Sequence, residues 1–406
     1  MSNVSIAPIR LDRRSAPLPL RSAQGVLAAL AFADLLVSSN AMHPLLPIFR
    51  QTLGLDPLET TLTFVSYVGV LCVVLLVLSQ PRLVRWSPLF LCIALAVAML
   101  GDVVLATAGI PGLMIGRALT GLAGGFGTGS ASALVVTALG ARGRAISATG
   151  NLAGAVVGVS MTELCILVFG RHAAAAAFLG HAAVSLVLLV ILVPVLVRNR
   201  AMNRTALTTH GAVKLRNLAP MIRQQWVLFS IGCLSWVTLS LAVSLLPSFF
   251  ADVGGPGPAI AIGIIAYLLS SSLGQIFSAS LARVAPWLSG LFAMVVGALL
   301  VPLGVAIGHP LMALLGFPVL GFGTGVAYRL SLVVLTKGSE PARQGALASL
   351  YGAVTYGAAT VASLTAGLTG NLLGLRSTIV AIFLLIAVVS AWLVWRAPRL
   401  RDDREV

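Results

Sequence analysis

Long apolar runs recur along the whole of this sequence. Each run holds about 20 or more mostly apolar residues, and short stretches with Gly, Pro or Arg separate the runs. Such a run crosses the hydrocarbon core of a bilayer as an α-helix, because a helix bonds its own backbone N–H and C=O groups. The first run is too long for a signal peptide, has no small-residue cleavage site and leads into a second run, so we expect it to be retained. The sequence therefore predicts an all-α polytopic membrane protein.

The composition agrees with this fold class. Of 406 residues only 9% are charged and 58% are hydrophobic, whereas a soluble domain carries about 25% charged residues. The predicted transmembrane helices lie at 22–49, 58–80, 87–108, 111–136, 144–169, 173–197, 226–250, 257–281, 287–307, 310–336, 342–369 and 375–396. Twelve spans place both termini on the same side of the membrane.

The distribution of cationic residues predicts which side this is. The net charge of +15 would suggest nucleic acid as a partner in a soluble protein. Here most Lys and Arg lie in the tails and in alternate loops, while only Arg50, Arg171 and Arg376 lie in the opposite loops. The positive-inside rule then places both termini in the cytoplasm. We therefore expect a multi-pass protein of the cell membrane, with the bilayer rather than nucleic acid as its surroundings.

A basic loop divides the chain into two parts. The predicted organisation is a cytoplasmic tail at 1–21, a six-helix bundle at 22–197, a basic linker at 198–225, a second bundle at 226–396 and a tail at 397–406. The linker contains six cationic residues and no acid. It either fixes topology between the bundles or binds lipid headgroups.

An internal repeat supports this division. The segment Leu45–Phe49 returns as Leu245–Phe249, and Tyr67 corresponds to Tyr267. Three glycines of the fourth predicted span have counterparts in the tenth, and every pair is offset by 200 residues. These glycines are Gly116, Gly121 and Gly125, with Gly316, Gly321 and Gly325. We expect two pseudo-symmetric six-helix bundles, which is a repeat scheme of transporters.

The fourth predicted span combines small residues with a charge. Gly121, Gly125 and Gly129 follow one another at intervals of four, which places them on one helical face where another backbone can approach closely. Arg117 lies in the outer third of the same span, where it costs about 2.5–3.5 kcal/mol unless it finds a partner or water. We therefore expect this helix to lie inside the bundle.

Three acids also fall within predicted spans, namely Asp34, Asp102 and Glu163. At a rise of about 1.5 Å per residue, Asp102 and Glu163 are level with Arg117, and Asp34 is nearer the midplane. Arg117 thus has three candidate partners. The charges either lock helices together or form a proton site, since proton relays in transporters use such residues. For a proton site we favour Asp34, with Glu163 or Asp102 as auxiliaries.

Polar side chains on one face of the first span are further candidates. Asn40, His43, Pro44 and Pro47 share a helical face roughly opposite Asp34. The prolines bend the helix, and the freed carbonyl groups need partners or water. His43 either titrates near neutral pH or is an ordinary hydrogen-bonding residue. The same alternatives apply to His181.

The predicted spans of the C-terminal half contain no acid. Arg329 is their only clear charge away from the span ends, and it either has a role or extends to the interface. The candidates for a substrate cavity are therefore polar or aromatic: Asn40, His43, Tyr67, Trp236, Tyr267, Gln275, Tyr351 and Tyr356. Such a set suits an apolar or weakly polar substrate better than a sugar phosphate.

Metal, disulfide and enzyme chemistry have no support in the sequence. The four cysteines all lie inside apolar segments, and no pair has metal-binding spacing. We also find no nucleophile with a base and no phosphate-binding loop. We expect no cofactor, no metal and no enzymatic activity.

The segment Leu113–Gly125, LMIGRALTGLAGG, resembles the fourth-span motif of the major facilitator superfamily. The resemblance covers the whole chain and implies a role in proton coupling for Arg117. Asn40, Pro44 and Pro47 are similar to the first-span motif of the twelve-span drug:proton antiporters.

The chain also departs from the pattern of these antiporters. In the loop after the second span, Arg82 and Arg85 match positions with a gating role, but Gln80 stands where the family has an acid. In the fifth span, Gly150, Gly154 and Gly158 keep the helix-packing spacing. Ala155 and Val159 replace the proline and the last glycine of the antiporter motif there.

Together these features predict a secondary transporter that exports small, largely apolar compounds in exchange for protons and works as a monomer. Two alternatives stay open. The same residues serve a proton symporter that takes up a metabolite. A receptor or scaffold that transports nothing is the other alternative, although its intramembrane charges would then lack a purpose.

Overall fold

The computed structural model describes residues 18–78, 81–107, 109–207, 222–246, 249, 257–285, 288–307, 309–336 and 341–397. Within these ranges the regular structure is entirely helical. The N-terminal helices are α1 (Leu18–Ala41), η1 (His43–Leu45), α2 (Leu46–Leu53), α3 (Pro57–Leu78), η2 (Pro81–Trp86), α4 (Ser87–Ala106), α5 (Ile110–Leu139), α6 (Ala141–Phe169), η3 (Gly170–His172), α7 (Ala173–Arg198) and α8 (Arg200–Ala206). The C-terminal helices are α10 (Trp226–Ser244), α12 (Gly257–Val284), α13 (Leu288–Ala306), α14 (Pro310–Thr336), α15 (Pro341–Leu373) and α16 (Leu375–Arg396).

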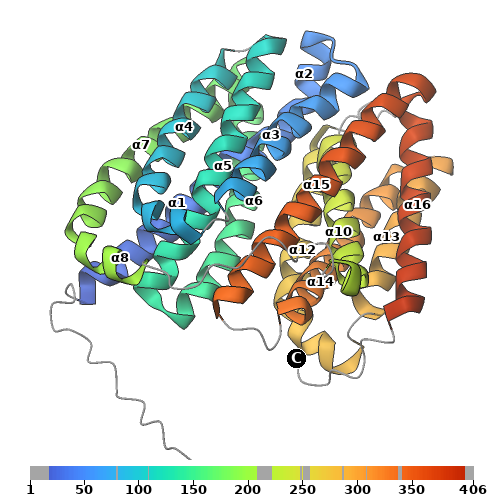
Figure 1. The fold of residues 1–406 in the computed structure, drawn as a ribbon. Coiled ribbons are helices and arrows are strands. Elements are labelled where there is room, and N and C mark those ends of the chain that lie inside the picture. Colours follow the sequence, from blue (N-terminus) through green and yellow to red (C-terminus); the bar gives the residue numbers. More distant parts are fainter. Residues whose placement is uncertain are drawn as a thin grey trace, which may run out of the picture.

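The helices form two groups that lie side by side, with α1 to α8 in one and α10 to α16 in the other (Figure 1). Each predicted span overlaps a long helix in the described ranges. By length and composition, nine segments there qualify to cross a membrane, and one of them, Gly154–Arg198, contains parts of both α6 and α7. The chain is therefore an all-α polytopic membrane protein, as predicted.

The first predicted span is not one straight helix. α1 ends at Ala41, a short 3₁₀ segment follows at His43–Leu45, and α2 then begins at Leu46. Pro44 and Pro47 lack the N–H that would continue the α-helical ladder, and each lies at the start of the next helical segment. The predicted bend at these prolines is confirmed.

The repeat offset of 200 residues reappears as equivalent contacts in the two halves. A Cβ added to Gly121 would lie 3.0 Å from the carbonyl carbon of Tyr67, and closer still to its oxygen. A Cβ added to Gly321 would lie 2.9 Å from the carbonyl carbon of Tyr267, again closer to the oxygen. In both halves a glycine thus lets two backbones meet at the same place, which confirms the internal repeat at these positions.

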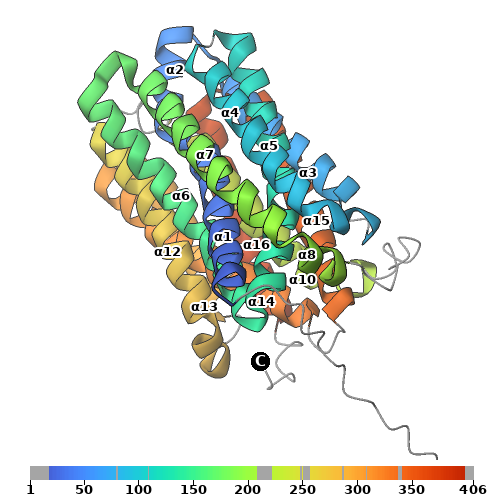
Figure 2. The same cartoon turned by 90° about the vertical axis from the view of Figure 1, so that its left-hand side faces the viewer.

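The beginning of the predicted basic linker is folded against the N-terminal half. In α8, Asn203 and Gln24 of α1 exchange two amide hydrogen bonds of 2.9 and 3.2 Å, and both side chains are buried. Asn199 donates to the carbonyl oxygen of Leu20. Figure 2 shows α8 near the end of α1, where α7 runs across it. Residues 208–221 of the linker lie outside the described ranges.

The two halves meet mainly where α3 packs on α15 and α6 on α12. Phe64 and Val68 of α3, with Ala155 and Val159 of α6, belong to one apolar core with the C-terminal helices. Near α2, the Asn371 amide donates to Asp56 Oδ2 at 2.8 Å, and the Leu58 N–H donates to Asn371 Oδ1 at 3.0 Å. Polar bonds therefore supplement the apolar interface at this end.

We expect Asn371→Ala to loosen the contact between the halves at this end. Both bonds are exposed, so the loss should be about 0.5–1.5 kcal/mol per bond. Spin labels on α3 and α15 should then report a longer or broader distance distribution. Thr365→Ala is the control, because its exposed hydroxyl bonds only Val361 of its own helix. An unchanged distribution in Asn371→Ala would show that this pair does not hold the halves together.

Candidate functional site

The buried centre of the N-terminal half is an acid–histidine cluster, formed by Asp34 of α1, Asp102 of α4 and His181 of α7. The Nδ1 atom of His181 lies 2.6 Å from Asp102 Oδ2. Its Nε2 atom lies 2.9 Å from the carbonyl oxygen of Asp34 and 3.3 Å from Asp34 Oδ1. The three side chains are between 0% and 6% exposed. One imidazole thus joins two carboxylates from two other helices.

Two hydroxyl groups complete the cluster. Ser185 donates a hydrogen bond of 2.6 Å to Asp34 Oδ2, and Ser38 donates one of 2.8 Å to Asp102 Oδ1. Ser185 lies one helical turn beyond His181, and Ser38 one turn beyond Asp34, so the local helix geometry aligns each pair. Since a buried carboxylate is stable only when it is paired and hydrogen-bonded, these contacts explain how two acids persist here.

The prediction that Arg117 pairs with one of the three acids is wrong. Among the described residues no carboxylate lies within ion-pair distance of its guanidinium. Instead, Nε donates to the carbonyl oxygen of Thr63 at 3.2 Å, and a terminal nitrogen donates to that of Ser39 at 2.9 Å. Equal depth in the membrane does not mean a shared face: Asp102 points to α1 and α7, while Arg117 points to the backbones of α1 and α3.

Arg117 also contacts an aromatic ring. Its guanidinium carbon lies 4.5 Å from the ring centre of Tyr67, and the Arg117 side chain is only 1% exposed. A desolvated cation over an aromatic face gains about 2 kcal/mol. Ser39, which accepts the bond from Arg117, follows directly after Ser38 of the acid–histidine cluster. On α1, Ser38 thus contacts the acid–histidine cluster, and the next residue, Ser39, contacts Arg117.

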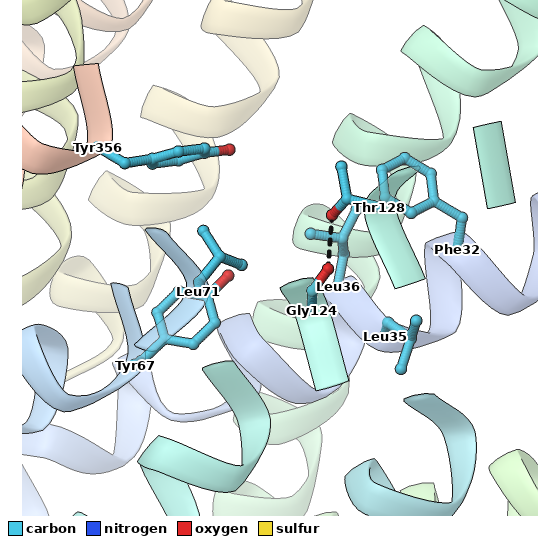
Figure 3. A pocket seen from close by; sticks show the side chains of 8 residues that line it. All are labelled: Phe32, Leu35, Leu36, Tyr67, Leu71, Gly124, Thr128 and Tyr356. Atoms are coloured by element: carbon cyan, nitrogen blue, oxygen red, sulfur yellow. Dashed lines mark hydrogen bonds between the residues drawn. The ribbon is translucent and has the colours of Figure 1, made fainter. Parts of the chain in front are cut away.

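A small cavity lies between the two halves. It is lined by Phe32, Leu35, Leu36, Tyr67, Leu71, Gly124, Thr128 and Tyr356. Figure 3 shows Tyr67 of α3 and Tyr356 of α15 reaching into the space from one side, with α1 and α5 on the other. Its volume of ≈ 40 Å³ has room for a few water molecules but not for an organic substrate. An organic substrate would therefore need the lining helices to move apart.

Aromatic side chains of the C-terminal half continue from the cavity wall. The rings of Trp236 and Tyr356 lie 4.2 Å apart, and those of Trp236 and Tyr328 lie 6.0 Å apart. Tyr328 in turn contacts Tyr351 at 5.3 Å. These residues come from α10, α14 and α15, so three helices present one aromatic cluster next to the cavity.

Two predicted cavity residues lie elsewhere, in the core of the C-terminal half. Tyr267 and Tyr351 are both 0% exposed and do not line the cavity. The hydroxyl of Tyr267 bonds Thr324 at 2.9 Å, and that of Tyr351 bonds Ser331. Burial of a tyrosine requires such a partner for its hydroxyl. Both residues therefore pack the helices of this half.

The remaining polar candidates also lie outside the cavity lining. Asn40 donates to Leu36 O and Ser39 Oγ, so its amide is used within α1. His43 is buried, and its Nδ1 atom has no hydrogen-bond partner among the described residues. The main-chain carbonyl oxygen of Gln275 accepts a hydrogen bond from the Arg329 guanidinium. Arg329 thus contacts α12.

The packing glycines divide into two groups. A Cβ on Gly125 would lie 2.6 Å from Val74, and one on Gly154 or Gly158 would overlap the backbone of α1 at Ala33 or Val37. Gly129 does not belong to the packing strip, because a Cβ there would meet nothing within 4 Å. α3 ends at Leu78, one turn beyond Val74, and Gly129 is exposed. Gly150 lies outside the residues whose side-chain positions are described.

Of the remaining predicted residues, Arg85 and Glu163 lie away from the cavity lining. Arg85 is exposed, with its guanidinium 5.5 Å from the Trp86 ring centre. The Arg82 side chain lies outside the described part of the chain. Glu163 of α6 is partly buried.

Among the described residues no group of three His, Cys, Asp or Glu side chains is arranged to hold a metal, and the four cysteines are free thiols.

The residues that sequence reasoning missed are Ser38, Ser185 and the joining role of His181. His181 is indeed a hydrogen-bonding residue, but its partners lie 79 and 147 positions away in the sequence. No local motif marks such contacts. The one available signal was the presence of polar residues at interval four, Asp34 with Ser38 and His181 with Ser185, in otherwise apolar spans.

Comparisons with known proteins agree with the helical fold. A family model described as Major Facilitator Superfamily matches residues 27–363. A search of curated proteins gives no match. Among solved structures, a point mutant of the nucleoside transporter NupG is similar with a TM-score of 0.68 at 12% identity, over 95% of this chain and 100% of that one. A bacterial homologue of the human lysosomal transporter Spinster, inward-facing and unoccupied, is similar with a TM-score of 0.63 at 13% identity, over 96% and 99%.

Proposed function

The chain belongs to the Major Facilitator Superfamily, and from this premise we propose that it is a proton-coupled exporter of small apolar or amphipathic compounds. In this proposal the two six-helix halves rock against each other around the central cavity, so that the site opens to one side of the membrane at a time. The N-terminal half supplies the energy coupling. The substrate site lies between the halves; most of its lining comes from α1, α3 and α5 of the N-terminal half, and Tyr356 comes from the C-terminal half.

The observation that carries the proposal is the cavity between the halves. Tyr67 and Tyr356 contribute to its wall from opposite halves, and the other lining side chains are mostly apolar. No acid lines it, and the Arg117 guanidinium lies over the Tyr67 ring. A wall of this kind suits an aromatic or apolar substrate, neutral or weakly acidic, better than an organic cation or a sugar phosphate.

The coupling residues are proposed from burial and charge. Asp34 and Asp102 are buried acids inside a membrane helix bundle. Ionisable residues at such positions cost free energy and usually have a function. Arg117 holds the cavity-lining helices α1, α3 and α5 together through two main-chain carbonyls. We assign proton binding to the acids and the link to the cavity to Arg117. Glu163 is an auxiliary, and Arg82 and Arg85 act at the gate.

The orientation and assembly follow the same reasoning. Both termini and the linker at 198–225 face the cytoplasm of a cell membrane, as the positive-inside rule indicates. The bundles at 22–197 and 226–396 are the moving units. One chain contains both halves of the cavity, so the monomer is the functional unit, with protons and a small molecule as its ligands.

Uptake by proton symport is the alternative, because the same buried residues serve either direction. Inside-out vesicles with an acid interior separate the two. Accumulation of a compound inside such vesicles at the expense of the gradient supports export, and proton-driven release from them supports uptake. A chain that moves no compound and no protons under either gradient would instead be a receptor or scaffold.

We expect Asp34→Asn to remove most proton-driven transport in proteoliposomes, because the variant lacks a buried carboxylate while keeping its size and a hydrogen bond to Ser185. The assay follows a panel of neutral and weakly acidic aromatic compounds together with internal pH. Glu59→Gln is the matched control, since it also turns a carboxylate into an amide but at an exposed helix start. Unchanged proton-driven transport in Asp34→Asn would show that Asp34 has no part in coupling.

A further inference from the structure

The hydrogen-bond geometry of the acid–histidine cluster fixes where its protons must be. The Nε2 atom of His181 faces the main-chain carbonyl oxygen of Asp34, which can only accept, so Nε2 carries a hydrogen. The Nδ1 atom lies 2.6 Å from Asp102 Oδ2, a separation that two lone pairs cannot share. A second hydrogen therefore lies between Nδ1 and Oδ2. It belongs either to an imidazolium or to a protonated Asp102, and the number of protons is the same.

We propose that His181 and Asp102 together form the proton-binding centre of this chain, and that loss of their shared proton separates α7 from α4 and α1. In the release step the hydrogen between Nδ1 and Oδ2 passes to water as H₃O⁺. A neutral imidazole then presents a lone pair to the Asp102 carboxylate, so the attractive contact becomes a repulsive one. This deepens the proposed proton coupling and relies on that proposal only for its use in transport.

The groups that face His181 support this reading. Asp34 faces it from α1 and Asp102 from α4. From α6, which also packs on α7, no described charged side chain lies within ion-pair distance of the imidazole. With one shared proton the cluster carries a net charge of one negative unit, and without it two. Two negative charges in a dry, low-dielectric site repel strongly, so the deprotonated cluster is stable only when it opens to water.

The position of the cluster also gives it a route to the cavity. On α1, Phe32, Leu35 and Leu36 line the cavity, while Asp34 and Ser38 bond to the cluster on the other side of the helix. Ser39 accepts the hydrogen bond of Arg117, whose guanidinium lies over Tyr67 of the cavity wall. Movement of α1 away from α4 and α7 would therefore displace one cavity wall and one anchor of Arg117. The proton site and the substrate site are separate and share a helix.

The test replaces the proton-sharing pair by two amides. The double variant Asp102→Asn with His181→Gln can keep a hydrogen bond between the two positions without any proton to lose. The full-length protein in lipid nanodiscs is followed by hydrogen–deuterium exchange over a pH series, with each rate divided by that of the unfolded peptide. We expect the protection of α4 and α7 in the native protein to fall severalfold as pH rises, and that of the double variant to stay constant.

Two further variants show whether the response is specific. Ser185→Ala removes a hydroxyl from the cluster but no proton, so it should keep the pH response. Arg117→Lys should keep it as well, because the proton site does not include Arg117. A double variant with the native pH response would overturn the proposal, and so would loss of the response in Arg117→Lys.

If the double variant does not fold, the native protein still provides a test. Nitrogen-15 spectra of histidine-labelled protein should contain one ring that has hydrogen at Nε2 and whose Nδ1 either carries or accepts a hydrogen at neutral pH. The Nδ1 signal of that ring should change to that of a free lone pair over the pH range in which protection of α7 falls. Absence of such a ring would overturn the proposal. None of these measurements needs a substrate. Failure of proton-driven transport alone would therefore count against the proposed function and not against the proton site.

Discussion

Replacing Arg117 by leucine should reduce proton-driven transport to the level of protein-free liposomes while leaving the protein folded. The guanidinium bonds α5 to the main chains of α1 and α3 and covers Tyr67. Its loss therefore removes the polar link among the three helices that line the cavity. Folding should survive, because Thr63 and Ser39 lose only an additional hydrogen bond at carbonyl groups within helices. Removing a buried charge also removes its desolvation cost.

The measurement combines transport in proteoliposomes with size-exclusion and thermal unfolding of the purified variant. Arg117→Lys keeps the charge but cannot donate to two carbonyls in the fixed geometry of a guanidinium, so we expect intermediate transport. Arg171→Leu is the control, since this exposed arginine lies in η3, away from the cavity. Normal transport in Arg117→Leu would refute the coupling role. An aggregated variant would identify Arg117 as a structural charge.

Gly121→Ala should destabilise the protein strongly, and Gly321→Ala should do so to a similar extent. In each case the new methyl group would overlap a main-chain carbonyl of the neighbouring helix, at Tyr67 or Tyr267. A backbone cannot move aside as a side-chain end can, so two helices must separate along their contact. Overpacking of this kind costs roughly 1–3 kcal/mol and occasionally more, against a gain of about 1 kcal/mol in helix propensity.

Thermal unfolding in detergent or nanodiscs measures this difference. Gly129→Ala is the matched control on the same helix, because its methyl group would meet nothing within 4 Å. It should leave the midpoint unchanged or raise it slightly. If Gly121→Ala unfolds at the same temperature as Gly129→Ala, the close approach of α3 and α5 at Tyr67 is not a feature of the protein.

The fold was largely predictable because its signals are local. Span length follows from runs of apolar residues, and the repeat follows from a constant offset that needs no structure. The offset even located the close contacts, since Gly121 and Gly321 meet Tyr67 and Tyr267 in the same way. Gly129 shows the limit: interval spacing defines a helical face, but not where the partner helix ends.

The site was less predictable because it depends on which way each helix faces. Counting residues gave similar depths for Asp102 and Arg117, yet the two side chains point to different neighbours. The rotation of a helix about its own axis is set by packing with all its neighbours, and an all-round apolar span gives little sign of it. For the same reason, no local signal shows that His181 joins two acids from other helices.

The pairing of Gln24 with Asn203 has a consequence for the order of assembly in the cell. These residues lie near the two ends of the N-terminal half, so their amides can meet only after six helices have entered the membrane. The rest of the chain then needs roughly 10–40 s of synthesis. During that interval the helices of the first half can pack together, and α8 can bond to α1. The second half can therefore pack on α3 and α6 of a bundle that is already complete.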